Sequence, residues 1–271
     1  MKLTGTRVLL TGASGGIGSA SARALVDAGA RVMGVGRGPR PATSAATAWV
    51  SADLATAEGR AAVIEAARQW GAQVVVLGAG EPAFGPLMGL DEATLQRVLH
   101  MNLTVPALMA QGLVPVLRQA PQARLVFVGS ALARIGVPGF AWYGATKAGV
   151  HRLAETLRRE LADTSVRVQM LAPRATRTGF NSAAVTAQQQ ATATAVDPPE
   201  RVAEALVRLL HSDRAELHLG GPERLFGALN AWFGPHMDGG FAKHRAALNA
   251  VATPPGATPA TGNPPAAPSR P

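Results

Sequence analysis

A continuous apolar run, QVVVL at residues 73–77, most constrains how this chain can fold. A strand that is apolar at every position needs cover on both faces, which is typical of parallel sheets between two helical layers. Helical stretches, expected at about 56–70, 91–118 and 141–162, alternate with further strand-like runs. The other runs lie at 7–10, 31–35, 48–51, 124–128, 165–171 and 215–219. This alternation predicts an α/β protein with a doubly wound parallel sheet of seven strands and helices on both faces.

The length and the 47% hydrophobic content suit a single domain, predicted over residues 1–252. Residues 179–197 lack clear periodicity, which leaves open a substrate loop that acts as a lid and an ordinary surface insertion. A C-terminal helical segment is expected at 222–250. Its aromatic part, 224–237, could cover a pocket, stabilise an oligomer or touch a membrane surface, and burial against the protein's own core is preferred. The Pro/Ala-rich tail 253–271 is predicted to be disordered.

Charge and composition argue against several classes of partner. The net charge is +9, but the 26 basic residues are scattered, so no nucleic-acid partner is expected. No apolar stretch is long enough for a membrane span, and no signal-peptide pattern is found, so a cytoplasmic location is expected. The chain has no cysteine, and its six histidines show no metal-ligand spacing along the sequence, so no metal site is predicted.

A glycine-rich turn, TGASGGIG at Thr11–Gly18, joins the first strand to the first helix. Backbone N–H groups at a helix N-terminus bind a dinucleotide pyrophosphate, and glycines allow the ligand to come close. The turn therefore predicts a dinucleotide site, although glycines alone are also compatible with an ordinary tight turn. The residues expected to contact the cofactor here are Gly12, Ser14, Gly16, Ile17 and Gly18.

The only tyrosine of the chain, Tyr143, precedes Lys147 by one helical turn, so the two side chains share a face. A nearby ammonium group lowers the pKa of a phenol from about 10 toward the range useful for general acid–base catalysis. Ser130 ends the strand 124–128, where a hydroxyl faces the ligand crevice of such a sheet and can bond a substrate oxygen. Asn102 lies within the helix 91–118, where asparagine is a poor helix former and needs an explanation.

Together, the glycine turn and the residues Asn102, Ser130, Tyr143 and Lys147 resemble the classical short-chain dehydrogenase/reductase family over about residues 5–225. The resemblance implies a Rossmann-type fold and hydride transfer between a nicotinamide cofactor and a carbonyl or alcohol. It implies that Tyr143 donates the proton, Ser130 positions the substrate oxygen, Lys147 also binds the cofactor ribose and Asn102 supports proton resupply. It further implies a homodimer or homotetramer built through the helices 91–118 and 141–162. The additional cofactor contacts that it implies are Asp53, Leu54, Ala79, Gly80, Pro173 and Thr178.

The second strand ends in VGRGPR, residues 35–40, which contains no acidic residue. Gly36 stands where relatives that prefer NAD carry an aspartate, and Arg37 stands where relatives that prefer NADP carry an arginine. A guanidinium group can hold a 2′-phosphate through two hydrogen bonds, with help from Arg40. This predicts NADP(H) as the cofactor, with NAD(H) as the alternative. A solvent-facing Arg37 is the plainer interpretation.

Two segments depart from the family pattern. Residues 77–80 are Leu-Gly-Ala-Gly in place of Asn-Asn-Ala-Gly, so the hydrogen bonds of two asparagines must be replaced or dispensed with. Arg174 replaces the usual glycine after Pro173, where it either recruits an anionic group or points to solvent.

The sequence thus predicts an NADP(H)-dependent oxidoreductase that acts on a small-molecule carbonyl or alcohol. The alternatives are an NAD-dependent alcohol dehydrogenase of the same fold and a non-catalytic NADP-binding sensor or scaffold.

Overall fold

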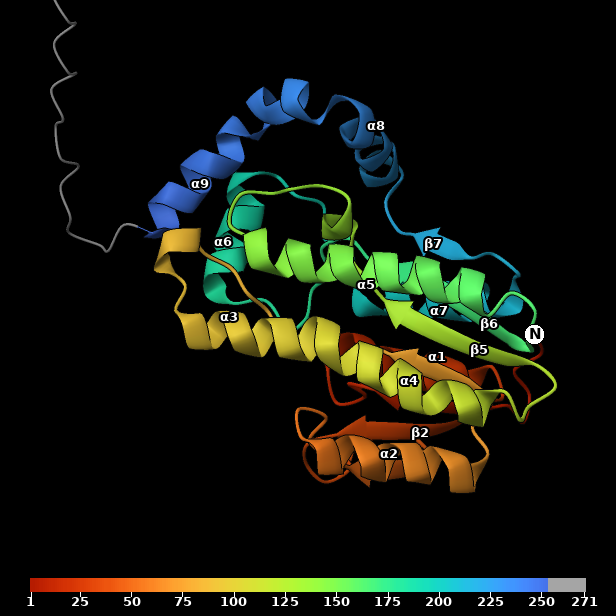
Figure 1. The fold of residues 1–271 in the computed structure, drawn as a ribbon. Coiled ribbons are helices and arrows are strands. Elements are labelled where there is room, and N and C mark those ends of the chain that lie inside the picture. The colour runs from red at the N-terminus through yellow and green to blue at the C-terminus, as the bar shows by residue number, and fades with distance from the viewer. Residues whose placement is uncertain (253–271) are drawn as a thin grey trace, which may run out of the picture.

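A computed structural model describes residues 1–252, in which seven parallel strands form one sheet of order β3-β2-β1-β4-β5-β6-β7 (Figure 1). The order reverses direction between β1 and β4, and this reversal opens a ligand crevice at the carboxyl ends of the strands. The predicted doubly wound parallel sheet of seven strands is confirmed. The strands are β1 (Arg7–Thr11), β2 (Arg31–Gly36), β3 (Ala48–Ser51), β4 (Val74–Leu77), β5 (Ala123–Val128), β6 (Val166–Ala172) and β7 (Glu216–His218).

Helices cover both faces of the sheet (Figure 1). One face packs against α2 (Ala57–Trp70), α4 (Val105–Leu117) and α5 (Ala141–Glu160), and the other against α1 (Gly16–Asp27) and α7 (Pro199–His211). Within β4, Val75 and Leu77 belong to the first core, whereas Val74 and Val76 belong to the second. Because side chains alternate across a strand, two covered faces require an apolar residue at every position, as the QVVVL run indicated.

The helix expected at 91–118 is divided into α3 (Glu92–Leu99), a π-helical turn (His100–Thr104) and α4. Asp91 begins α3 by accepting a hydrogen bond of 2.6 Å from the Thr94 amide. Asn102 lies in the π turn, and such turns are frequent at functional sites. The helical segment predicted over about 91–118 is therefore confirmed, and the structure adds a π-helical turn at the residue that the sequence singled out.

Residues 179–197 contain a helix, α6 (Ala183–Ala191), which the sequence analysis did not anticipate. Ser182 begins it by accepting a hydrogen bond from the Val185 amide. Only Val185 and Gln188 are buried, and the Gln188 side chain donates to the Pro138 carbonyl over 3.1 Å. Because one of its two buried side chains is a glutamine, α6 has no continuous apolar face, and the sequence therefore shows no amphipathic helix pattern there.

The expected C-terminal helical segment is α8 (Gly221–Met237), a 3-10 turn (Asp238–Phe241) and α9 (Ala242–Ala252), which arch beyond one end of the sheet (Figure 1). The preferred burial of 224–237 against the core is wrong. Trp232 is 85% exposed, Leu225 is 63% exposed, and Gly227 is the one buried residue of α8. The helix lies outside the layers that cover the sheet, so most of its apolar side chains have no core to enter.

Two further 3-10 turns are Leu87–Gly89 and Ala131–Ala133, and the second of them lines the crevice through Ala131 and Leu132. The predicted disordered tail 253–271 lies outside the described residues. In residues 1–252, no helix combines the length and the apolar character needed to cross a membrane.

Candidate active site

The glycine-rich turn has the local geometry of a ligand cradle. Gly12 has φ of +71°, which favours glycine, and a Cβ there would lie 3.0 Å from the backbone of Ala79. A Cβ at Gly18 would overlap the carbonyl oxygen of Gly12, and one at Gly16 would lie 2.6 Å from the Thr178 side chain. Because α1 begins at Gly16, its first N–H groups are free of side-chain cover. The turn therefore fits the phosphate groups of a dinucleotide.

A cleft of about 1260 Å³ runs from this turn across the carboxyl ends of the strands. Every residue predicted for catalysis or cofactor binding lines it, with the exceptions of Asn102 and Arg40. The members are Gly12, Ser14, Gly16, Ile17, Gly18, Arg37, Asp53, Leu54, Ala79, Gly80, Ser130, Tyr143, Lys147, Pro173 and Thr178.

The Thr11 side chain bonds the backbone around the end of β4, where the family pattern has two asparagines. Its hydroxyl accepts from the amides of Gly78 (3.0 Å) and Ala79 (3.2 Å) and donates to the Val76 carbonyl (3.4 Å). The side chain is 1% exposed, so these bonds satisfy buried backbone groups at the end of β4. One threonine on the neighbouring strand thus holds the Gly78–Gly80 segment against β1.

Ser130, Tyr143 and Lys147 meet in the middle of the cleft. The Tyr143 hydroxyl and the Ser130 side chain are hydrogen-bonded. The Lys147 ammonium lies 5.6 Å from the centroid of the Tyr143 ring and donates to the Val128 carbonyl over 3.1 Å. Lys147 is 7% exposed and Ser130 is 9% exposed. The structure thus brings Ser130 together with Tyr143, thirteen residues later in the sequence, and with Lys147, a further four residues along.

The pKa of Tyr143 does not follow the prediction. Burial raises it to about 12, and the hydrogen bond with Ser130 only partly opposes this. Burial also lowers the pKa of Lys147 to about 8. Desolvation penalises the charged form of each group, and the ammonium bonds a backbone carbonyl instead of the phenol. The predicted lowering of the Tyr143 pKa by Lys147 is therefore wrong for the protein without a ligand.

Asn102 lies behind the cleft and is 1% exposed. Its Oδ1 accepts from the Glu81 amide (2.7 Å), and its Nδ2 donates to the Glu81 carbonyl (2.8 Å) and to Thr146 Oγ1 (3.4 Å). Thr146 in turn donates to the carbonyl of Tyr143 over 2.8 Å. From the π turn, the Asn102 side chain therefore links the segment after β4, through Glu81, to the helix that carries Tyr143, through Thr146.

Arg37 is exposed at the edge of the cleft, and no acidic group of residues 1–252 forms an ion pair with it. A Cβ at Gly36 would lie 2.7 Å from Trp49 Cζ2, and the Trp49 indole N–H donates to the Gly38 carbonyl over 2.9 Å. The indole thus occupies the space that an aspartate at position 36 would need. Arg40 lies outside the cleft and donates to the Ser44 carbonyl over 3.3 Å.

Arg174 neither points to solvent nor stands free to recruit an anion. Its guanidinium donates two hydrogen bonds to Asp197 (2.9 and 2.7 Å) and one to Glu223 of α8 (3.2 Å). Asp197 is 2% exposed and also receives Arg201 at 3.0 Å. The hydrogen bonds from Arg174 hold the pKa of Asp197 below its usual range. This network ties both ends of the 174–197 loop to α8, and neither interpretation of Arg174 from the sequence is correct.

Aromatic side chains near Tyr143 were missed in the sequence. Five of the seven phenylalanines line the cleft: Phe84, Phe140, Phe180, Phe226 and Phe241. The Tyr143 ring centroid lies 6.0 Å from that of Phe180 and 6.4 Å from that of Phe140. They come from five separate segments, so no local pattern could have grouped them.

Comparison with known proteins shows the family of the chain. The short chain dehydrogenase family model matches residues 6–189. The chain is 34% identical over 231 residues to the cis-4-hydroxycyclohexanecarboxylate dehydrogenase of Sinomonas cyclohexanicum, covering 78% of this chain and 91% of that protein.

Two solved structures illustrate the likeness in fold. The 3-ketoacyl-(acyl-carrier-protein) reductase of Brucella melitensis, complexed with NADH, has a TM-score of 0.70 at 25% identity, covering 82% of this chain and 99% of that one. A short chain dehydrogenase from Burkholderia cenocepacia, in complex with NADP, has a TM-score of 0.77 at 21% identity, covering 89% and 99%. The chain belongs to the short-chain dehydrogenase/reductase family of oxidoreductases.

Proposed function

We propose that the protein is an NADP(H)-dependent oxidoreductase that interconverts a carbonyl compound and an alcohol. The observation that carries this proposal is the Ser130, Tyr143 and Lys147 cluster, which shares one cleft with the glycine cradle. The dinucleotide, when bound, supplies or accepts the hydride. Its phosphates would lie on the Gly12–Gly18 turn, and its adenosine would lie beside Arg37, Asp53 and Leu54. Its nicotinamide end would lie near the cleft residues from the later strands and from α5, which are Ala79, Gly80, Tyr143, Lys147, Pro173 and Thr178.

The chain's own groups manage the substrate oxygen and its proton. The Ser130 hydroxyl holds the oxygen beside Tyr143. With a pKa near 12, Tyr143 carries its proton at neutral pH and can donate it during reduction. The phenolate left behind is stabilised by the hydrogen bond from Ser130. The Lys147 ammonium, which lines the same cleft, would bind the cofactor ribose. Asn102 acts through Thr146 to position the Tyr143 segment, and we assign to it support of proton resupply.

The cofactor preference rests on Arg37 and Trp49. A carboxylate that would bind the ribose hydroxyls of NAD is missing at position 36, and the Trp49 indole fills its place. An unpaired guanidinium at the cleft edge suits a 2′-phosphate. The relatives differ among themselves, since one structure holds NADP and another NADH. The preference of this chain is therefore argued from its own residues.

Arg37→Ala should weaken NADPH binding by about 10- to 100-fold, because a hydrogen bond to a charged group contributes about 1.5–3 kcal/mol. NADH binding should change by less than about 3-fold, since NADH lacks the phosphate. Fluorescence titration with both dinucleotides measures this. The matched control is Arg40→Ala, which removes a nearby guanidinium outside the cleft. A preference for NADPH that survives Arg37→Ala would refute this account of selectivity.

The phenylalanine-lined wall indicates a bulky, apolar carbonyl substrate. Burying one large apolar side chain or an equivalent ligand group contributes about 1.5–3 kcal/mol, so a cleft with five phenylalanines favours such compounds over small polar ones. The Sinomonas relative is named for a six-membered ring alcohol. An NADPH-consumption screen over aldehydes, cyclic and aromatic ketones, quinones and acyl thioesters tests this, and the ring ketones should give the highest kcat/KM. Preference for small polar aldehydes would contradict it.

The pH dependence should report Lys147. Its pKa of about 8 means that the ammonium predominates below pH 8 and is lost as the pH rises above it. We expect kcat/KM for NADPH in the reduction direction to fall above about pH 8, because this ratio reports groups of the free enzyme. Lys147→Arg, which stays charged, should show residual activity without that decline. A wild-type profile that stays flat from pH 7 to about 9.5 would contradict the role given to Lys147.

We also propose a homodimer or homotetramer through the outward faces of α4 and α5. Ala141, Ala145 and Ala148 form an exposed row of small side chains on α5, which would allow close approach of a second copy. Light scattering coupled to gel filtration distinguishes these assemblies from a monomer.

A further inference from the structure

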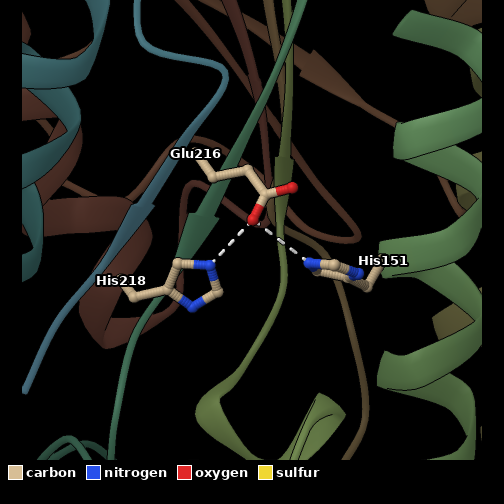
Figure 2. Close-up of side chains that lie close together, drawn as sticks. All are labelled: His151, Glu216 and His218. Carbon is tan, nitrogen blue, oxygen red and sulfur yellow. Dashed lines mark hydrogen bonds and ion pairs between the residues drawn. The ribbon is translucent and has the colours of Figure 1, made fainter. Parts of the chain in front are cut away.

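Two histidines and a glutamate converge beside the active-site cleft (Figure 2). His151 lies on α5, one helical turn beyond Lys147, and Glu216 and His218 lie on β7. None of the three lines the cleft. Glu216 and His218 are two residues apart on a strand, so they share the face of β7 that looks toward α5.

The three side chains present their ligating atoms to one point. Glu216 Oε2 lies 2.9 Å from His218 Nε2 and 3.3 Å from His151 Nε2. The atoms of all three groups lie within 4.8 Å of one another, and no other such group occurs in residues 1–252. The side chains are 18%, 26% and 11% exposed for His151, Glu216 and His218, so the site is half-buried yet open to an ion.

We propose that His151, Glu216 and His218 form a binding site for a divalent transition-metal ion, best suited to Zn²⁺. Two imidazoles and one carboxylate are an established zinc ligand set, usually completed by water. Tetrahedral bonds of about 2.0–2.2 Å place ligand atoms roughly 3.3 Å apart. The two measured separations are within a few tenths of an ångström of that value, and small side-chain rotations would accommodate the third.

The charged groups around the cluster bear on its affinity for a cation. A carboxylate with its ordinary pKa is ionised at neutral pH, so Glu216 can offer a negative oxygen to a metal ion. Arg158 lies 3.4 Å from the other carboxylate oxygen, Oε1, and leaves Oε2 to face the two histidines. The Arg158 charge opposes a cation, so we expect moderate affinity in place of the tight affinity of a closed structural site.

The position of the site indicates what an ion would do. The helix α5 carries Tyr143 and Lys147, and β7 leads through Gly220 into α8, whose Pro222 and Glu223 line the cleft. An ion between His151 and the β7 residues would cross-link the catalytic helix to the strand before that wall. It would act as a structural clamp outside the cleft.

Isothermal titration of untagged, EDTA-treated full-length protein with ZnCl₂ tests this inference. We expect one site per chain with a Kd in the micromolar range and a Zn²⁺-dependent rise in Tm of a few degrees. His151→Ala and His218→Ala should each weaken binding by about 10-fold or more and remove the rise in Tm. The matched control is His236→Ala, which removes an exposed histidine of α8 and should leave both unchanged.

Glu216→Gln retains the shape of the side chain and tests the charge if an alanine variant does not fold. Its Zn²⁺ affinity should also fall by about 10-fold. Absence of binding by the wild type up to 1 mM Zn²⁺, or an equal loss in His236→Ala, would overturn the proposal. NADPH titration of the same variants separates this site from the proposed function, because the three residues lie outside the cleft and cofactor affinity should persist.

Discussion

Tyr143→Phe should reduce kcat for carbonyl reduction by about 10³-fold, within the range of roughly 10²–10⁴ that a positioned proton donor contributes. The substitution removes only the hydroxyl that bonds Ser130, and it keeps the ring that packs against Phe140 and Phe180. No other tyrosine exists in the chain to replace it. Steady-state NADPH oxidation with a saturating ketone measures the effect.

The same variant separates an enzyme from a non-catalytic NADP-binding sensor or scaffold. NADPH affinity and Tm should match the wild type, because the phosphate cradle and the aromatic packing are unchanged. Thr194→Val is a suitable control, since it removes another hydroxyl from the cleft wall, one that bonds Thr192 and not the cluster. Its kcat should change by less than about 3-fold. Retention of more than about a tenth of the wild-type turnover in Tyr143→Phe would contradict the proton-donor role.

Asp197→Ala should lower the free energy of unfolding by about 3–5 kcal/mol, the usual effect of removing one partner of a buried ion pair. Asp197 is 2% exposed and binds both Arg174 and Arg201. Its loss leaves the Arg174 guanidinium, itself only 15% exposed, with Glu223 as its remaining acidic partner. Urea unfolding followed by circular dichroism measures the change.

The exposed pair Arg208–Glu204, separated by 3.7 Å on α7, offers a control. Glu204→Ala should change stability by less than about 1 kcal/mol, because exposed ion pairs contribute little. If Asp197→Ala does not fold, Asp197→Asn should show a smaller loss, since the amide oxygen can still accept one hydrogen bond. A loss below about 1 kcal/mol for Asp197→Ala would show that the network does not anchor the loop.

Features set by local chemistry were predictable from the sequence. The QVVVL run required a strand covered on both faces, and β4 lies at the centre of the sheet. The glycines of the first turn are required by close backbone approach, which depends on neighbours in sequence and in the adjacent strand. Tyr143 and Lys147 are four residues apart on one helix, so the sequence alone predicted that their side chains share a face.

Features that depend on distant segments were not predictable. The Thr11 hydroxyl accepts from the Gly78 amide, 67 residues away along the chain, because β1 lies beside β4. The direction of the Tyr143 pKa shift depends on burial, which no local motif reports. The cluster of His151, Glu216 and His218 joins α5 to β7, so spacing rules applied to the histidines along the sequence could not find it. In each case the missing information is tertiary contact.

A crystal structure with NADP⁺ bound tests the central claim most directly. The account predicts the phosphates on the Gly12–Gly18 turn, the 2′-phosphate bonded to Arg37, and the nicotinamide ring beside the hydroxyl of Tyr143 and the ammonium of Lys147. A bound dinucleotide whose nicotinamide ring lies away from that hydroxyl, or whose 2′-phosphate makes no contact with Arg37, would contradict it.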